Sequence, residues 1–127
     1  MEQITSKNYV ENVLKTEPKE LDSIRARLQS DTKIRLIHAS DGMVTEAGEF
    51  KDAIKKHIFY GKPIDIKNLQ EELGDTLWYI GLACDALGIS LDEVLTLNIE
   101  KLRKRYGDKF TEKSALNRDI DNEMSHY

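Results

Sequence analysis

The sequence is poor in the residues that interrupt helices and in those that cross-link chains. It has two prolines and seven glycines among 127 residues, and the apolar-polar alternation typical of strands is scarce. Its single cysteine, Cys84, cannot form a disulfide within the chain and lies in an apolar segment, which predicts a small buried side chain. Long helices are therefore expected, rather than a sheet or a disulfide scaffold.

Long apolar runs are also missing. The start of the chain lacks the charged and apolar regions of a signal peptide. The best apolar stretch, residues 77–87, is short and contains Asp85, so it cannot span a bilayer. A net charge of -4 disfavours nucleic-acid binding, which usually requires a strong basic face. We expect a soluble, cytoplasmic protein with no membrane or nucleic-acid partner.

Periodicity predicts a single all-α domain over residues 1–127, because apolar residues recur mostly at three- and four-residue steps. Four helices are expected at residues 18–28, 31–60, about 65–87 and about 91–106. Their short connections suit a four-helix-bundle-like architecture. An apolar stripe on the third of these helices comprises Leu69, Leu73, Leu77, Ile80 and Leu87. Residues 1–17 are expected to form an arm or a short helix, and residues 119–127 a loose tail.

Local signals mark the ends of these helices. Pro18 suits the first turn of a helix. Either Asp65 or Asn68 could cap the helix that starts there, and Gly88 closes it. Ser90 begins a Ser-Leu-Asp-Glu sequence with the spacing of a capping box.

Two glycines, Gly42 and Gly48, interrupt the longest predicted helix. Glycine weakens a helix interior. It also allows another backbone or a ligand to come close, because it has no Cβ atom. The two residues therefore weaken the prediction of a continuous helix and leave room for such an approach.

Two pairs of carboxylates carry the chemistry. Glu46 and Glu49 are three residues apart in one predicted helix, and Glu72 and Asp75 are three apart in the next. Residues at this spacing lie about 60° apart around the helix axis and one turn along it. Each pair therefore shares a face, beside the apolar stripe of its helix. If the stripes pack together, the four carboxylates converge.

Converging carboxylates repel one another unless some are protonated or cations neutralise them. An all-oxygen cluster suits Mg²⁺ first and Mn²⁺ second. A di-iron bundle would instead use Glu-x-x-His, and none of the histidines (His38, His57, His126) falls in such a tetrad. A single Glu-x-x-Glu is usually a solvated helix face, so spacing alone leaves a metal site and solvated faces as open alternatives.

The double tetrad resembles the signature of the MazG-like all-α nucleoside triphosphate pyrophosphohydrolases. Glu46-x-x-Glu49 and Glu72-x-x-Asp75 are separated by 22 residues (50 to 71). The similarity extends to Thr45-Glu-Ala-Gly-Glu49, to Glu71-Glu-Leu-Gly-Asp75 and to the Leu77-Trp78-Tyr79 that follows, and it runs from about Leu36 to Asp119. The short chain resembles the compact single-domain members, with the architecture shared by dimeric dUTPases.

The resemblance implies a Mg²⁺-dependent hydrolase that cleaves between the α and β phosphates, releasing a nucleoside monophosphate and pyrophosphate. By similarity, Glu46, Glu49, Glu72 and Asp75 hold the metal, and Glu46 or Glu49 takes the proton of the attacking water. Two alternatives remain open. One is a dUTP- or phosphoribosyl-ATP-type pyrophosphatase of the same superfamily, and the other is a non-enzymatic helical bundle that binds a partner.

The triphosphate needs cationic or polar contacts beyond the metal. Asn98, Lys101 and Arg105 share one face of the last predicted helix, and Asn98-x-x-Lys101 resembles the family's phosphate-contacting pair. The alternative is that these basic residues only complement the helix dipole. Lys55-Lys56-His57 is expected to be a solvated face.

Aromatic residues near the carboxylates could contact the base or another part of the substrate. Tyr79 lies one turn beyond Asp75 and is the better candidate, whereas Trp78 is expected in a core or an interface. His38, two turns before Glu46, could also touch the substrate or serve a structural role.

The apolar surface left over by so short a chain predicts a homodimer or homotetramer. Members of the resembled family usually pair their bundles, and a second subunit could complete the nucleotide site.

Overall fold

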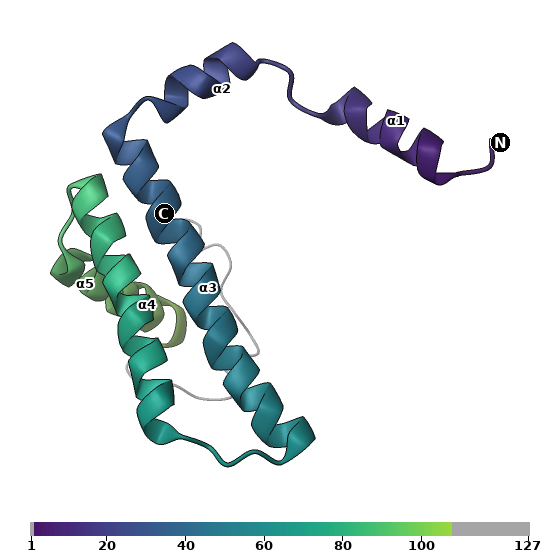
Figure 1. Ribbon diagram of the computed structural model, residues 1–127. Coiled ribbons are helices and arrows are strands. Elements are labelled where there is room, and N and C mark those ends of the chain that lie inside the picture. Colours follow the sequence, from purple (N-terminus) through teal and green to yellow (C-terminus); the bar gives the residue numbers. More distant parts are fainter. Residues whose placement is uncertain (1, 108–127) are drawn as a thin grey trace. The chain divides into compact units, whose positions relative to one another are not determined.

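The computed structural model describes residues 2–107, and all regular structure within them is α-helical (Figure 1). The helices in chain order are α1 (Ser6–Thr16), α2 (Leu21–Leu28), α3 (Asp31–Tyr60), α4 (Ile66–Leu87) and α5 (Leu91–Tyr106). The predicted all-α class is confirmed. The predicted tail at residues 119–127 lies outside the described residues.

The described residues divide into two compact units, with the boundary between Ile34 and Arg35. The first unit contains α1, whose N-cap Thr5 accepts a hydrogen bond from the backbone N–H of Asn8. The prediction that Pro18 opens a helix is wrong, because α2 begins at Leu21. A residue before proline is disfavoured in helical conformation, and Glu17 is extended. Pro18 thus ends α1 rather than starting α2.

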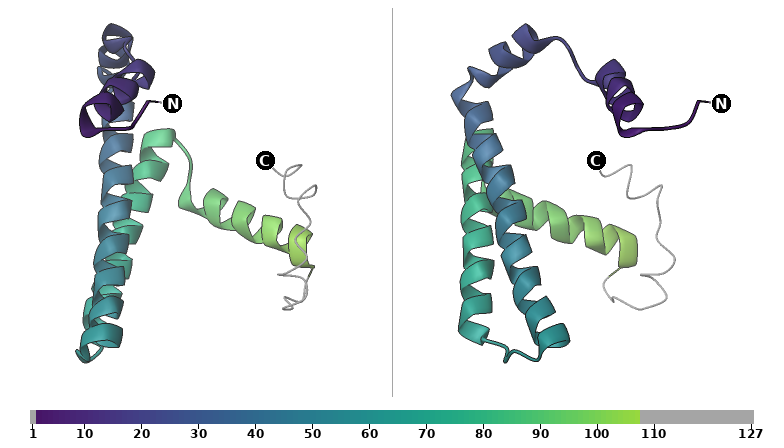
Figure 2. Two further views of the ribbon diagram at one scale, coloured as in Figure 1. Left: turned by 90° about the vertical axis from the view of Figure 1, so that its right-hand side faces the viewer. Right: turned by 45° about the vertical axis from the view of Figure 1, so that its right-hand side comes forward.

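The second unit is built on a hairpin in which α3 and α4 run side by side in opposite directions (Figures 1 and 2). The carboxylate of Asp65 caps α4 by accepting the N–H of Asn68 at 3.1 Å. The hydroxyl of Ser90 caps α5 by accepting the N–H of Glu93 at 3.0 Å. Gly88 ends α4 with a φ of 70°, in the left-handed region that glycine adopts without strain.

The two internal glycines do not break α3, which is continuous from Asp31 to Tyr60. Among the described hydrophobic residues Ala39 and Cys84 are buried, as predicted for the cysteine, and Gly42 is buried with them. These small residues allow the two helices to approach closely.

The apolar stripe predicted for α4 does not all face α3. Leu69 and Ile80 are partly buried, but Leu73, Leu77 and Leu87 remain more than half exposed in the single chain. The partly buried face of α4 instead includes Glu72, Thr76 and Tyr79. The way α4 turns about its axis therefore places a carboxylate and an aromatic ring against α3, where the sequence predicted leucines.

Helix α5 leaves the end of α4 and runs away from the hairpin (Figure 2). Its apolar side chains remain largely exposed, with Leu95 at 55%, Leu97 at 47% and Ile99 at 46%. No helix within residues 2–107 has the length and apolar character needed to cross a membrane.

Candidate metal and substrate site

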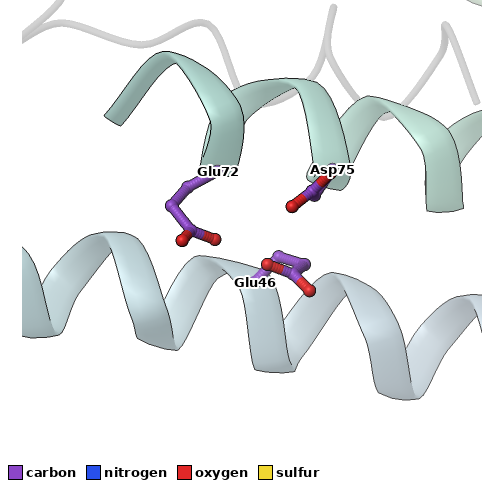
Figure 3. A group of neighbouring side chains, drawn as sticks. All are labelled: Glu46, Glu72 and Asp75. Carbon is purple, nitrogen blue, oxygen red and sulfur yellow. The ribbon is translucent and has the colours of Figure 1, made fainter. Parts of the chain in front are cut away.

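Three carboxylates meet between the helices of the hairpin. Glu46 extends from α3, and Glu72 and Asp75 extend from α4, so that the three groups point toward one another (Figure 3). Each offers an oxygen, and these oxygens lie within 4.8 Å of one another. Glu46 and Glu72 are partly buried, whereas Asp75 is exposed. The structure thus brings together three of the four predicted metal ligands.

The fourth carboxylate, Glu49, is exposed and lies beside Glu72. Interaction with the carboxyl group of Glu46, then burial, then interaction with Glu49 raise the pKa of Glu72 from 4.5 to about 7. The cause is that adjacent carboxylates repel when all are ionised. Without a cation the cluster therefore retains a proton near neutral pH.

Two oxygen atoms in this cluster have no hydrogen-bond partner among residues 2–107. They are Glu46 Oε2 and Glu72 Oε2, and both are buried. Buried acceptors that lose their water are costly unless they gain another partner. A hard divalent cation prefers carboxylate oxygens and would satisfy both atoms while removing the repulsion. The residues present therefore fit such a cation.

An aromatic hollow adjoins the cluster. It has a volume of about 370 Å³ and is lined by His38, Trp78, Tyr79, Glu46 and Asp75. The ring centroids of Trp78 and Tyr79 are 5.0 Å apart with an interplanar angle of 80°. Those of His38 and Tyr79 are 5.7 Å apart at 73°. Both predicted aromatic contacts, His38 and Tyr79, thus lie beside two of the carboxylates, and Trp78 is 60% exposed.

The Tyr79 ring owes its position to Gly42. A Cβ atom added at Gly42 would lie 2.2 Å from Cε1 of Tyr79, well inside van der Waals contact. Only glycine lets the ring approach α3 so closely. The sequence left room for a backbone or a ligand at this glycine, and the structure places the side chain of Tyr79 there instead.

A second hollow, of about 310 Å³, lies where α3 and α4 are joined, and we call it the connection hollow. It reaches Glu49 and Glu72, so it also adjoins the cluster. Its apolar wall consists of Ala53, Ile54, Pro63, Ile64 and Leu69. Its charged and polar groups, besides those of the cluster, come from Asp52, Lys56, Lys62, Asp65 and Asn68. Sequence reasoning missed this hollow, although Asp52 and Ala53 follow Glu49 by one helical turn.

Two lysines of α3, Lys55 and Lys56, are engaged with Asp52, and the second of them lines the connection hollow. The carboxylate oxygens of Asp52 lie 3.2 Å from Lys55 Nζ and 2.7 Å from Lys56 Nζ. These contacts lower the pKa of Asp52. The connection itself is held by His57, whose Nδ1 lies 2.7 Å from the carbonyl oxygen of Lys62. The predicted solvated face therefore also shapes one edge of the hollow.

The predicted phosphate contacts are placed elsewhere. Asn98 is exposed on α5, and Lys101 and Arg105 are partly buried there. None of the three lines either hollow that adjoins the carboxylates. Their contact with phosphate remains a prediction.

The model of the MazG nucleotide pyrophosphohydrolase domain matches residues 38–110, more than half of the chain. The chain belongs to this family. The family resemblance predicted from the double tetrad is therefore confirmed, and the MazG match contains all four carboxylates and both hollows. Oxygen-rich and bordered by two hollows, the cluster is the candidate centre of this MazG domain.

A phage protein is also similar to this chain. The Gene 37 protein of Mycobacterium phage L5 is 32% identical over 74 residues, which cover 55% of this chain and 65% of the relative. The matched region thus spans slightly less than two thirds of that relative, whose name states no activity. No solved structure matches the chain.

Proposed function

We propose that this MazG domain hydrolyses a nucleoside triphosphate between its α and β phosphates, releasing a nucleoside monophosphate and pyrophosphate. The carrying observation is the convergence of Glu46, Glu72 and Asp75, with two buried oxygens that lack partners, between two hollows. The donor set favours Mg²⁺, with Mn²⁺ as a substitute.

Each carboxylate has a distinct part in this proposal. When bound, Mg²⁺ would neutralise phosphate oxygens and the charge that develops during hydrolysis. Glu46, Glu72 and Asp75 would hold it. Glu49 lies outside the trio and is exposed, so its carboxylate is better placed than that of Glu46 to accept a proton from the attacking water.

The substrate contacts follow from the aromatic hollow. Tyr79 carries a hydroxyl group and His38 a ring N–H, which can donate hydrogen bonds beside the carboxylates. The predicted phosphate contacts of Asn98, Lys101 and Arg105 belong to this proposal too. Because they line neither hollow within one chain, they would reach the substrate from a second copy.

A homodimer or homotetramer is part of the proposal, since an apolar strip on α4 borders the site. Leu73, Leu77 and Trp78 are 55%, 57% and 60% exposed, and they lie next to Glu72 and Asp75 in the chain. Contiguous exposed apolar side chains typically mark an interface. Removing them from water would stabilise the assembly by about 25 cal/mol for each Å² of apolar surface buried.

We expect light scattering after size-exclusion chromatography to give a mass at least twice that of one chain. The Leu73→Glu and Leu77→Glu double variant should shift the mass to that of a single chain, because it would bury two charges in the interface. Ser40→Glu adds a charge at an exposed position of α3 instead of on this strip and serves as the control. A monomeric wild type at tens of micromolar concentration would contradict the assembly.

The function is tested by incubating the protein with each ribo- and deoxyribonucleoside triphosphate, dUTP and phosphoribosyl-ATP included, with Mg²⁺. We expect a nucleoside monophosphate and pyrophosphate by chromatography, and no product with EDTA. Preference for dUTP or phosphoribosyl-ATP would support the related pyrophosphatases. Diphosphate with orthophosphate would refute the α–β cleavage. No product and no Mg²⁺-dependent rise in melting temperature would favour a non-enzymatic helical protein.

A further inference from the structure

The two hollows reach the carboxylate cluster from its two ends. The aromatic hollow includes Glu46 and Asp75, whereas the connection hollow includes Glu49 and Glu72. Since α3 and α4 run in opposite directions, these residues follow one another along the hairpin. A substrate whose reacting phosphates lie at the cluster would have the aromatic hollow on one side and the connection hollow on the other.

The aromatic hollow suits the phosphate end. Phosphate oxygens accept hydrogen bonds and cannot donate them when ionised. The phenol of Tyr79, the indole of Trp78 and the imidazole of His38 each carry a donor. Because these rings stand beside Glu46 and Asp75, they can donate to oxygens of a phosphate chain that is held at the cluster.

The connection hollow has the opposite chemistry. Besides Glu49 and Glu72 it is lined by the carboxylates of Asp52 and Asp65 and by two lysines, Lys56 and Lys62. Because the carboxylates outnumber the lysines, the lining as a whole disfavours a polyphosphate. The carboxylate of Asp52 forms ion pairs with Lys55 and Lys56. The carboxylate of Asp65 accepts a hydrogen bond from the backbone N–H of Asn68. Apart from these charged groups the lining is apolar, except for the side-chain amide of Asn68, which can both donate and accept.

This combination matches a nucleoside. A nucleoside is uncharged, presents flat apolar faces, and carries donors and acceptors on its base edge. Small-molecule sites are mostly apolar with a few placed polar groups, and their volumes start at roughly 300 Å³. The 310 Å³ of the connection hollow is therefore enough for part of a nucleotide, but not for a whole triphosphate.

We propose that the connection hollow binds the nucleoside half of the substrate, with Ala53 in its wall and the Asn68 amide contacting the base edge. This assignment rests on the proposed function, because it takes the phosphates to lie at the carboxylates. It makes the α3–α4 connection, rather than the aromatic hollow, the element that selects the base.

The test compares two ligands that share the phosphates but differ in the nucleoside. Calorimetry with Mg²⁺ measures binding of α,β-methylene nucleoside triphosphates, which cannot be cleaved at this link, and of inorganic triphosphate. Ala53→Leu, which fills the hollow, should weaken the nucleoside analogues by tenfold or more and leave inorganic triphosphate within twofold. Ala47→Leu, on an exposed part of the same helix, is the matched control and should change neither.

Asn68→Ala is the second variant, in case the larger side chain at residue 53 prevents folding. It should alter the ranking of the four bases without changing the binding of inorganic triphosphate. Equal loss for both ligands in Ala53→Leu, or unchanged nucleoside binding in both variants, would overturn the assignment. So would a wild type that binds neither ligand, or both equally. Tight analogue binding that Ala53→Leu abolishes, without turnover of any triphosphate, would support the nucleoside hollow and refute the hydrolysis.

Discussion

Replacing Glu72 by glutamine is expected to lower kcat/KM for nucleoside triphosphates by at least about 10²-fold. Glutamine keeps the shape of the side chain and one oxygen, but it removes the negative charge that would hold a divalent cation together with Glu46 and Asp75. The same variant should lose most of the Mg²⁺-dependent rise in melting temperature. Both losses have the same physical cause, because the wild-type cation binds the folded state.

Without metal, Glu72→Gln should make the folded chain less sensitive to rising pH than the wild type. The pKa of Glu72 is raised from 4.5 to about 7 in the folded chain, so folding retains a proton that the unfolded chain releases. The stability contributed by this proton is complete below pH 4.5 and is lost as the pH rises through about 7. In EDTA, the wild type should therefore lose melting temperature between pH 5 and pH 8, and Glu72→Gln should lose less.

Glu71→Gln is the matched control. Glu71 is the exposed neighbour of Glu72, and its replacement removes the same charge from the same helix. It should retain turnover, the response to Mg²⁺ and the wild-type pH profile of melting. Two results would argue against a cation site at the cluster: retention of the Mg²⁺ response by Glu72→Gln, or equal losses in both variants.

The features that could be predicted from the sequence are those that depend on neighbours along the chain. Asp65, Gly88 and Ser90 act within one helical turn, so turn chemistry was sufficient to locate them. The facing of Glu46 toward Glu72 and Asp75 was also predictable. A three-residue step fixes which side chains share a face, and a short connection makes adjacent helices antiparallel.

Features that depend on rotation and register between helices could not be predicted. Leu73 and Leu77 fit the apolar stripe of α4, yet they are exposed, because α4 turns Glu72 and Tyr79 toward α3 instead. The connection hollow shows the same dependence. Nothing in the sequence around Asp52 and Asn68 forms a motif, and only the antiparallel register places these residues in one hollow.

Gly42→Ala is expected to reduce kcat/KM by about 10- to 100-fold, because a displacement near 1 Å at a substrate-positioning group can cost that much. The new methyl group would lie 2.2 Å from Cε1 of Tyr79, so the ring must leave its place beside His38. Overpacking typically costs about 1–3 kcal/mol, only partly offset by about 0.5–1 kcal/mol from replacing a helical glycine by alanine. Thermal unfolding should therefore show a lower melting temperature.

Gly48→Ala provides the comparison, since it lies in the same helix and a Cβ atom there meets nothing within 4 Å. It should leave turnover unchanged and raise stability by about 0.5–1 kcal/mol. A double-mutant cycle separates the ring from the helix. In a Tyr79→Ala background the clash is gone, so Gly42→Ala should become neutral or stabilising and should cause no further loss of kcat/KM. If Gly42→Ala still impairs turnover there, Gly42 acts on the site by a route other than the position of Tyr79.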